Sequence, residues 1–146
     1  MCMSARINIS QVEPKSIQAM MGLESYMGDV DLPANLRQLI KIRASIINNC
    51  AYCIQMHTLE SKRLGEDEQR LFALAAWQES PLFSEQERIV LSLTDAVTQI
   101  YNNGVSDALY TQCLELLGEH ALAQCMMQIV TINAWNRIAV ATKMIF

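Results

Sequence analysis

The sequence has no run of apolar residues that would cross a membrane or direct secretion. Its longest uncharged, mostly apolar run, residues 121–136, contains two Gln, one Thr and two Asn, and Arg137 follows it. That run is too short and too polar for a membrane span. The first six residues lead into a polar stretch and lack both an apolar signal core and a small-residue cleavage site. We therefore expect neither export nor membrane insertion, and a cytoplasmic location.

Clusters of basic residues are also missing. The net charge is −4 and the Lys and Arg residues are scattered, so nucleic acid and anionic membranes are not expected partners. The five cysteines are an odd number, and Cys2, Cys113 and Cys125 are widely separated. This pattern argues against an extracellular disulfide framework and favours a reducing compartment.

Alternating polar and apolar residues, the pattern of a half-buried strand, are not found, and the β-branched residues fall within helical patterns. We therefore predict an all-α fold: a single domain over residues 1–146 with about six or seven helices. Apolar residues make up 51% of the chain and charged residues only 18%. The apolar surplus suggests an interface between subunits.

Caps and breakers predict where the helices begin and end. A short first helix is expected between Pro14 and Gly22, and a second, with Pro33 at its first position, reaches Ile47. A third helix has Asn49 as its N-cap and Gly65 at its C-cap, and a fourth begins with the acidic residues at Glu66 and ends near Trp77. A Ser84/Glu87 capping box begins the next helix, which stops at 102–104. Ser106 caps a helix over 108–117, and Gly118 ends it before the final helix. Met20, Met21 and Met27 form soft apolar surface, which fills a core or an interface more often than it lines a ligand pocket.

The decapeptide Asn49-Cys-Ala-Tyr-Cys-Ile-Gln-Met-His-Thr58 carries the reactive groups of the chain. In a helix, with about 100° between successive residues, Cys50, Cys53 and His57 share one face. With Asn49 as N-cap, Cys50 lies in the first turn, where free backbone N–H groups favour a thiolate. These three residues, on one helical hairpin, are the candidate site.

Two cysteines at this spacing can form and reopen a disulfide without rearranging the fold. His57 can accept the thiol proton. Cys53 is then the nucleophile for a peroxide oxygen, and Cys50 condenses with the resulting sulfenic acid. Zinc binding remains an alternative, although no second CxxC or HxxxH pair completes a ligand set. Simple core packing is another alternative, and it is the interpretation we favour for Cys113 and Cys125.

Most of the chain resembles the AhpD-like branch of the carboxymuconolactone decarboxylase family. The resemblance is carried by these segments: 36–43, 48–58, 62–66, 76–77, Phe83, 87–88 and 132–137. It implies an all-helical domain that forms homo-oligomers, commonly trimers or hexamers. It also implies a thiol peroxidase that needs no cofactor and acts through Cys50, Cys53 and His57.

One position departs from the family pattern. The resemblance implies a glutamate, linked to the histidine in a proton relay, twelve residues before the first cysteine, where this chain has Gln38. An amide can orient His57 or a water molecule but cannot accept a proton. Glu60, three residues after His57, is an alternative that would partly replace this glutamate, but we favour its interpretation as a surface carboxylate facing Lys62 or Arg63.

Two classes of function follow from the sequence. The first is a peroxidase that reduces hydrogen peroxide or an organic hydroperoxide and is re-reduced by an external dithiol protein or a small thiol. The second is a non-catalytic redox sensor or binding oligomer that uses the same disulfide. The family's lactone decarboxylases lack the CxxC pair, so its presence argues against that activity. For Trp135, Asn136 and Arg137, we favour a role in holding the final helix over one in lining the pocket.

Overall fold

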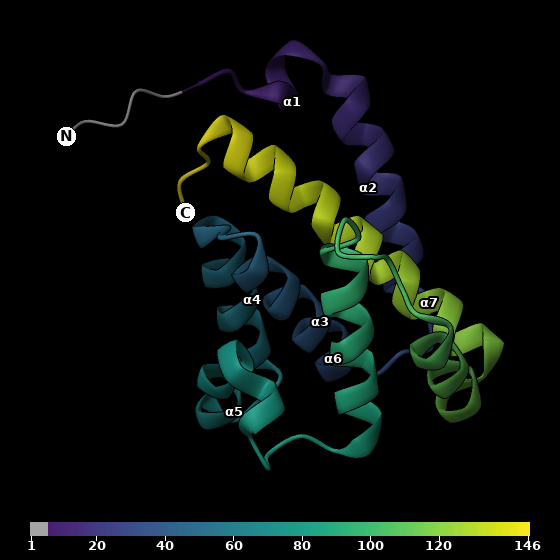
Figure 1. The fold of residues 1–146 in the computed structure, drawn as a ribbon. Helices are drawn as coiled ribbons and strands as arrows, with labels where there is room; N and C mark the ends of the chain where they lie inside the picture. The colour runs from purple at the N-terminus through teal and green to yellow at the C-terminus, as the bar shows by residue number, and fades with distance from the viewer. Residues whose placement is uncertain (1–5) are drawn as a thin grey trace.

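The computed structural model describes residues 6–146, and all regular secondary structure in that range is helical (Figure 1). The elements are α1 (Ile9–Val12), α2 (Pro14–Gly28), α3 (Ala34–Ile47), α4 (Ala51–Arg63), α5 (Glu68–Ala73), the 3₁₀ helix η1 (Leu74–Glu79), α6 (Glu85–Thr98) and α7 (Asp107–Thr142). The prediction of an all-α fold with six or seven helices is confirmed. Cys2 lies outside the described residues.

Helix α3 occupies the centre of the fold and contacts α4, α6, α7 and η1 (Figure 1). One core cluster joins α3 to α6 and α7, and includes the fully buried Ile40, Leu93 and Ile129. A second joins another side of α3 to α5, η1 and α6, and includes Leu39 and Leu74. Because α3 is buried on several sides, the segment that follows it is held firmly in place. That segment carries the two thiols.

Several predicted helix ends are found in the structure. Ser84 and Glu87 form a reciprocal capping box at the start of α6. Ser106 caps α7 by accepting a hydrogen bond from the Leu109 N–H (3.2 Å). Gly118 has φ 76° and ψ 165°, so it breaks α7 into two helical segments at the position expected from the sequence.

Other boundaries differ from the prediction. Helix α2 passes through Gly22 and ends at Gly28, and it packs against α7, whose contacts offset the cost of an internal glycine, about 1 kcal/mol. Pro33 is the N-cap residue of α3 and not its first helical residue. The short helix α1 was not expected, and the segment around Trp77 is 3₁₀ in place of α-helix.

A charged cluster ties α3 to α6 and η1. The Arg43 guanidinium donates to both Asp95 carboxylate oxygens (2.7 and 3.1 Å) and also to the Leu74 carbonyl oxygen (3.0 Å). Trp77 Nε1 donates to Asp95 Oδ2 (3.1 Å). Because the two charged side chains are only 12% and 18% exposed, each charge is stabilised mainly by its partner and little by water.

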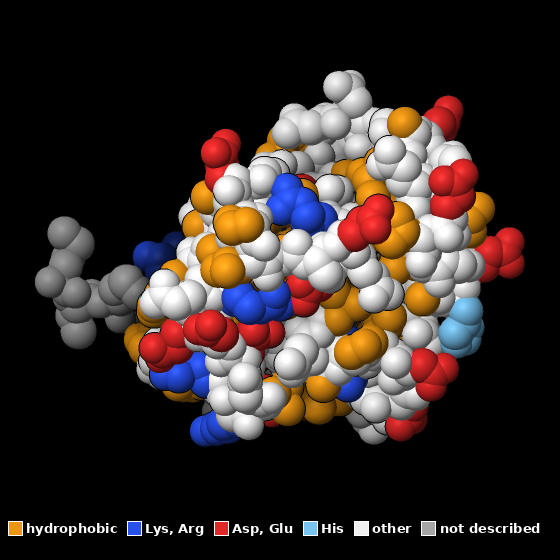
Figure 2. Space-filling view, turned by 90° about the horizontal axis from the view of Figure 1, so that it is seen from below, with side chains coloured by type: hydrophobic (Ala, Val, Ile, Leu, Met, Phe, Trp, Pro, Cys, Tyr) orange, Lys and Arg blue, Asp and Glu red, His pale blue; other side chains and the backbone are white. Residues whose placement is uncertain are grey.

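No helix within residues 6–146 is both long and apolar enough to span a membrane. On the face shown in Figure 2, hydrophobic side chains lie exposed between acidic and basic ones. Among the described residues, large apolar side chains that are more than half exposed include Phe72, Tyr101 and Ile145.

Candidate active site

The thiol pair lies where the chain turns from α3 into α4. Asn49 has a left-handed backbone (φ 54°), and Cys50 follows it in an extended conformation as the N-cap residue of α4. The Cys50 N–H donates to the Ser45 carbonyl oxygen (2.9 Å). The prediction that Asn49 caps this helix is therefore wrong. Asparagine tolerates the left-handed conformation that ends α3, so the cap falls one residue later.

This one-residue shift changes which thiol lies in the first turn of α4. Cys50 Sγ accepts a hydrogen bond from the Cys53 N–H (3.3 Å) and acts as the cap itself. Cys53, and not Cys50 as predicted, is in the first helical turn. Free N–H groups and the helix dipole favour an anion at this end of a helix, so the local field favours a Cys53 thiolate.

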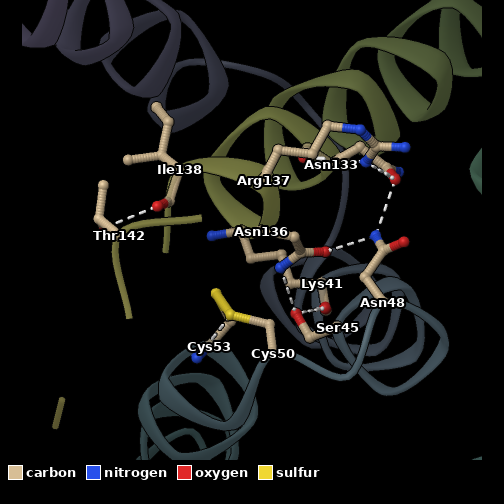
Figure 3. Close-up of a disulfide and its surroundings, with 10 residues drawn as sticks. All are labelled: Lys41, Ser45, Asn48, Cys50, Cys53, Asn133, Asn136, Arg137, Ile138 and Thr142. Carbon is tan, nitrogen blue, oxygen red and sulfur yellow. Dashed lines mark hydrogen bonds between the residues drawn. A yellow bond between two sulfur atoms is a disulfide. The ribbon is translucent and has the colours of Figure 1, made fainter. Parts of the chain in front are cut away.

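Cys50 and Cys53 form a disulfide, with their Cα atoms 5.3 Å apart (Figure 3). They are 1% and 2% exposed and pack against Ala139 of α7. Both cysteines belong to the start of α4, so the bond joins no two helices. Opening it would therefore break no covalent link between helices.

A network of polar side chains lies behind the disulfide and connects the end of α3 to α7 (Figure 3). Asn48 Nδ2 donates to Asn133 Oδ1 and to Asn136 Oδ1 (both 2.9 Å). Asn136 Nδ2 in turn donates to Ser45 Oγ (3.0 Å), which donates to the Lys41 carbonyl oxygen (2.6 Å). Asn136 is completely buried. These bonds fix the turn that carries Cys50.

The two neighbours of Asn136 have different surroundings. Arg137 donates to the carbonyl oxygen (3.1 Å) and the side-chain oxygen (2.9 Å) of Asn133, within α7. Trp135 Nε1 donates to Glu24 Oε1 on α2 (2.8 Å). Asn136 therefore holds the final helix against α3, as predicted, and Trp135 ties that helix to α2. The Arg137 bonds lie within α7 and do not support the predicted role of Arg137 in holding the helix.

A pocket of about 320 Å³, here called the thiol pocket, opens beside Cys53. Its walls come from α2, α4, α7 and the C-terminal segment, and are mostly apolar. The residues that line it are Met21, Glu24, Tyr52, Cys53, Met56, His57, Trp135, Ala139 and Met144. Cys50 is not among them, so Cys53 is the cysteine that a small molecule in this pocket would meet.

His57 is half-buried in the wall of the thiol pocket. Burial, and secondly the positive charge of Lys41, lower the pKa of His57 to about 4. The imidazole is therefore neutral at neutral pH while the disulfide is present. A neutral ring can accept a proton, but these surroundings do not stabilise the imidazolium that would result.

Gln38 lies on the other side of His57. A second pocket, of about 450 Å³ and here called the charged pocket, is lined by Gln38, Lys41, Met56, His57, Leu59, Glu60, Arg63 and Phe146. Gln38 is only 7% exposed, and its Oε1 has no hydrogen-bond partner within residues 6–146. Glu60 pairs with Arg63 (3.4 Å), which agrees with the interpretation of Glu60 as a surface carboxylate. Gln38 therefore shares the charged pocket with His57 but does not line the thiol pocket.

The sequence did not identify Glu24 and Lys41 as site residues. Glu24 is three residues after Met21, so a helix through both places them on one face. Nothing in the sequence shows which element that face covers, because residues of α2, α4 and α7 come to line one pocket only in the folded chain. Of the methionine group, Met27 is buried in the core, whereas Met21 is 54% exposed and lines the thiol pocket.

The remaining described cysteines are remote from this chemistry. Cys113 and Cys125 are free and fully buried in the core between α3, α6 and α7. Burial, and secondly the proximity of Cys113, raise the pKa of Cys125 to about 12, and burial also raises the pKa of Cys113. Both are inert core residues, as predicted. Within residues 6–146, no group of three or more His, Cys, Asp or Glu side chains is placed to hold a metal ion.

These features define an all-helical protein with a CxxC disulfide at the start of a helix and a histidine one turn further on. Residues 14–96 match the carboxymuconolactone decarboxylase family, and the chain belongs to that family.

Several known proteins are similar to this chain. The uncharacterised protein YdfG of Bacillus subtilis is 37% identical over 139 residues, which are 95% of each chain. A structure from Agrobacterium tumefaciens, of a protein of unknown function provisionally described as the antioxidant defence protein AhpD, is 38% identical over 96% of each chain, with a TM-score of 0.93. The debrominase Bmp8 is 19% identical over 93% of this chain and 73% of its own, with a TM-score of 0.82, and this likeness concerns the fold alone.

Proposed function

We propose that the protein is a thiol-dependent peroxidase that reduces hydrogen peroxide or organic hydroperoxides, with a role in antioxidant defence. The observation that carries the proposal is the position of Cys53. It lines an apolar pocket, lies in the first turn of a helix and is joined to a second cysteine that can be released by reduction. The Agrobacterium relative with its AhpD description supports the same class of activity.

The proposed cycle begins with the reduced pair. Cys53 attacks the distal oxygen of the hydroperoxide as a thiolate, an S–O bond forms, and the O–O bond breaks to release an alcohol or water. Cys50 then attacks the Cys53 sulfenic acid, the S–S bond forms and water leaves. The peroxide gains two electrons and the dithiol loses two. The thiols supply both electrons, so the cycle needs no cofactor.

Two further residues assist Cys53 in this proposal. His57 accepts the thiol proton, since it is neutral and shares the thiol pocket with Cys53. Gln38 orients His57 from the charged pocket but cannot hold a proton. We expect slower turnover than a carboxylate at position 38 would give.

An external dithiol protein or small thiol returns the disulfide to the reduced form. Such a partner fits a cytoplasmic location, where thiols are kept reduced. We also propose a homo-oligomer, because Phe72, Tyr101 and Ile145 expose large apolar side chains that a second copy would cover. The resemblance to the AhpD-like branch implies a trimer or a hexamer.

Hydroperoxide consumption in the presence of a dithiol reductant tests the function. We expect wild-type protein to consume the hydroperoxide, and Cys53→Ser to fall to the uncatalysed rate because it has no nucleophile in the pocket. Cys50→Ser should complete one S–O step and stop as a sulfenic acid, which a dimedone-type reagent traps and mass spectrometry detects.

Cys125→Ala is the matched control, because it removes a thiol that lies in the core and not in the thiol pocket. It should keep the wild-type rate. If wild type is no faster than Cys53→Ser, the peroxidase proposal fails, and the redox-sensor interpretation takes its place.

A further inference from the structure

The thiol pocket contains one acidic side chain among its described lining residues, that of Glu24 on α2. It shares the pocket with Cys53 and His57 and with five apolar residues and a tyrosine. An acidic group in a mostly apolar ligand pocket is one of the few polar features that can orient a bound molecule. The proposed function gives it no role.

The Glu24 carboxylate is held by one of its two oxygens. Trp135 Nε1 donates to Oε1 at 2.8 Å, and this bond links α2 to α7 across the pocket. Oε2 forms no hydrogen bond with the described residues. Fixing one oxygen orients the carboxylate, and the second is not committed to a donor within the described residues.

The charged and titratable neighbours of Glu24 come from α3 and α4. Burial lowers the pKa of Lys41 on α3, and the nearby negative charge of Glu24 partly counteracts that effect by raising it. The Lys41 and Glu24 side chains form no ion pair in the described structure. His57 and Tyr52 of α4 line the same pocket. Glu60 raises the Lys41 pKa in the same way but less strongly, and Arg37 lowers it. Glu24 is therefore the stronger of the two negative groups that offset the Lys41 cation beside His57, and it is the one that lines the thiol pocket.

The other candidates for proton transfer are poorly placed or chemically unsuited. Gln38 lines the charged pocket on the far side of His57 and carries an amide. His57 faces the Lys41 cation and is partly desolvated, so an imidazolium there needs a nearby negative charge. Glu60 lies in the charged pocket and pairs with Arg63.

We propose that Glu24, oriented by Trp135, is the acid–base residue of the thiol pocket. It accepts and donates the proton, which the Gln38 amide cannot do. The proposal rests on the peroxidase function proposed above. The proton that leaves Cys53 Sγ passes first to His57. The Glu24 carboxylate stabilises the resulting imidazolium and then accepts the proton from it. When the thiolate attacks the distal oxygen and the O–O bond breaks, the electron pair goes to the proximal oxygen. Glu24 Oε2 gives the proton to that oxygen, which leaves as an alcohol or water.

The test compares four variants by stopped-flow oxidation of the reduced protein with cumene hydroperoxide. Glu24→Gln keeps the shape and the Trp135 hydrogen bond but removes the proton carrier, and it should lower the rate of Cys53 oxidation about 100-fold at neutral pH. Glu24→Asp should restore most of that loss and keep the pH dependence of the rate. Trp135→Phe removes only the orienting donor and should cost about tenfold.

Glu13→Gln is the matched control, since it makes the same charge change on an exposed residue next to α2. It should leave the rate unchanged. Glu24→Gln at the wild-type rate and pH profile overturns the proposal while the peroxidase function stands. If Glu24→Gln loses the helical circular dichroism signal, Glu24→Asp and Trp135→Phe decide in its place. Wild-type rates of Cys53 oxidation in both of these variants would also overturn the proposal.

A second measurement separates this proposal from the peroxidase function. If wild type is no faster than Cys53→Ser, the function fails, and the pH dependence of Cys53 alkylation by iodoacetamide then decides about Glu24. If the Cys53 thiol and the Glu24 carboxylate are coupled, the pH midpoint of Cys53 alkylation shifts in Glu24→Gln but not in Glu13→Gln. An unshifted midpoint overturns the proposal.

Discussion

His57 is the residue at which burial should have the clearest effect on pH dependence. Its pKa is lowered to about 4 in the folded disulfide form, from about 6.5 in an unfolded chain. Below pH 6.5 the unfolded chain binds this proton more readily than the folded protein does. His57 therefore does not lower the free energy of unfolding above pH 6.5, and that free energy falls as the pH drops from 6.5 towards 4. We expect His57 to account for a loss of about 2 kcal/mol over that range.

Urea unfolding of the oxidised protein at pH 7 and pH 4.5 measures this loss. His57→Gln should show a smaller fall in unfolding free energy between the two pH values than wild type, because it cannot take up the proton. His120→Gln is the matched control, since His120 is 80% exposed and lies outside both pockets. Equal falls in wild type and His57→Gln would contradict the lowered pKa.

Single residues of the site were predicted from spacing where the chemistry is local. Cys50, Cys53 and His57 are within eight positions of one another, so helical geometry alone brings them together. Asn49 was misassigned because its side chain suits an N-cap and a left-handed turn equally well. Glu24 could not be predicted, since Trp135, its partner, is 111 positions away.

The contact between α3 and α6 gives a prediction for helix packing. Asp95→Asn leaves the Arg43 guanidinium, only 12% exposed, without its counter-charge. We expect a loss of about 2–3 kcal/mol in unfolding free energy, the lower end for breaking a buried pair, because both groups keep some contact with water. Urea denaturation at neutral pH measures it.

Glu60→Gln is the control for this pair. Glu60 meets Arg63 at 3.4 Å with side chains 46% and 75% exposed, so its removal should change stability by less than about 0.5 kcal/mol. Equal effects of the two substitutions would show that the Arg43–Asp95 pair does not secure the packing of α3 on α6.

Helix boundaries were predicted well where a side chain itself makes the cap. The Ser84/Glu87 box is complete within four residues, and Gly118 adopts a backbone conformation that favours glycine. Gly22 shows the limit of such signals. It stays helical because α2 packs against α7, a contact between segments that local sequence cannot reveal.

At the scale of the whole molecule, the fold class follows from helical periodicity, but the placement of the pockets does not. The thiol pocket needs α2, α4, α7 and the residues after α7 together. Each of these segments has an apolar face, and several pairings would bury such faces equally well. The positions of Lys41 and Glu24 relative to His57 depend on which pairing is adopted.

The same architecture predicts that the protein folds without its disulfide. The bond closes a loop of only four residues, Cys50 to Cys53, and chain entropy for so short a loop amounts to about 2 kcal/mol at most. Two core clusters around α3 lie apart from the thiols and are unaffected by reduction. Urea unfolding with and without dithiothreitol should therefore give free energies within about 2 kcal/mol of each other.

The Cys50→Ser/Cys53→Ser double variant separates the loss of the bond from other effects of the reductant. It should unfold with the free energy of reduced wild type, and its circular dichroism should match that of the oxidised protein. A reduced protein that loses its helical signal would show that the bond is structural. A pair needed for folding could not alternate between dithiol and disulfide at each turnover, so this result would also remove the basis of the peroxidase cycle.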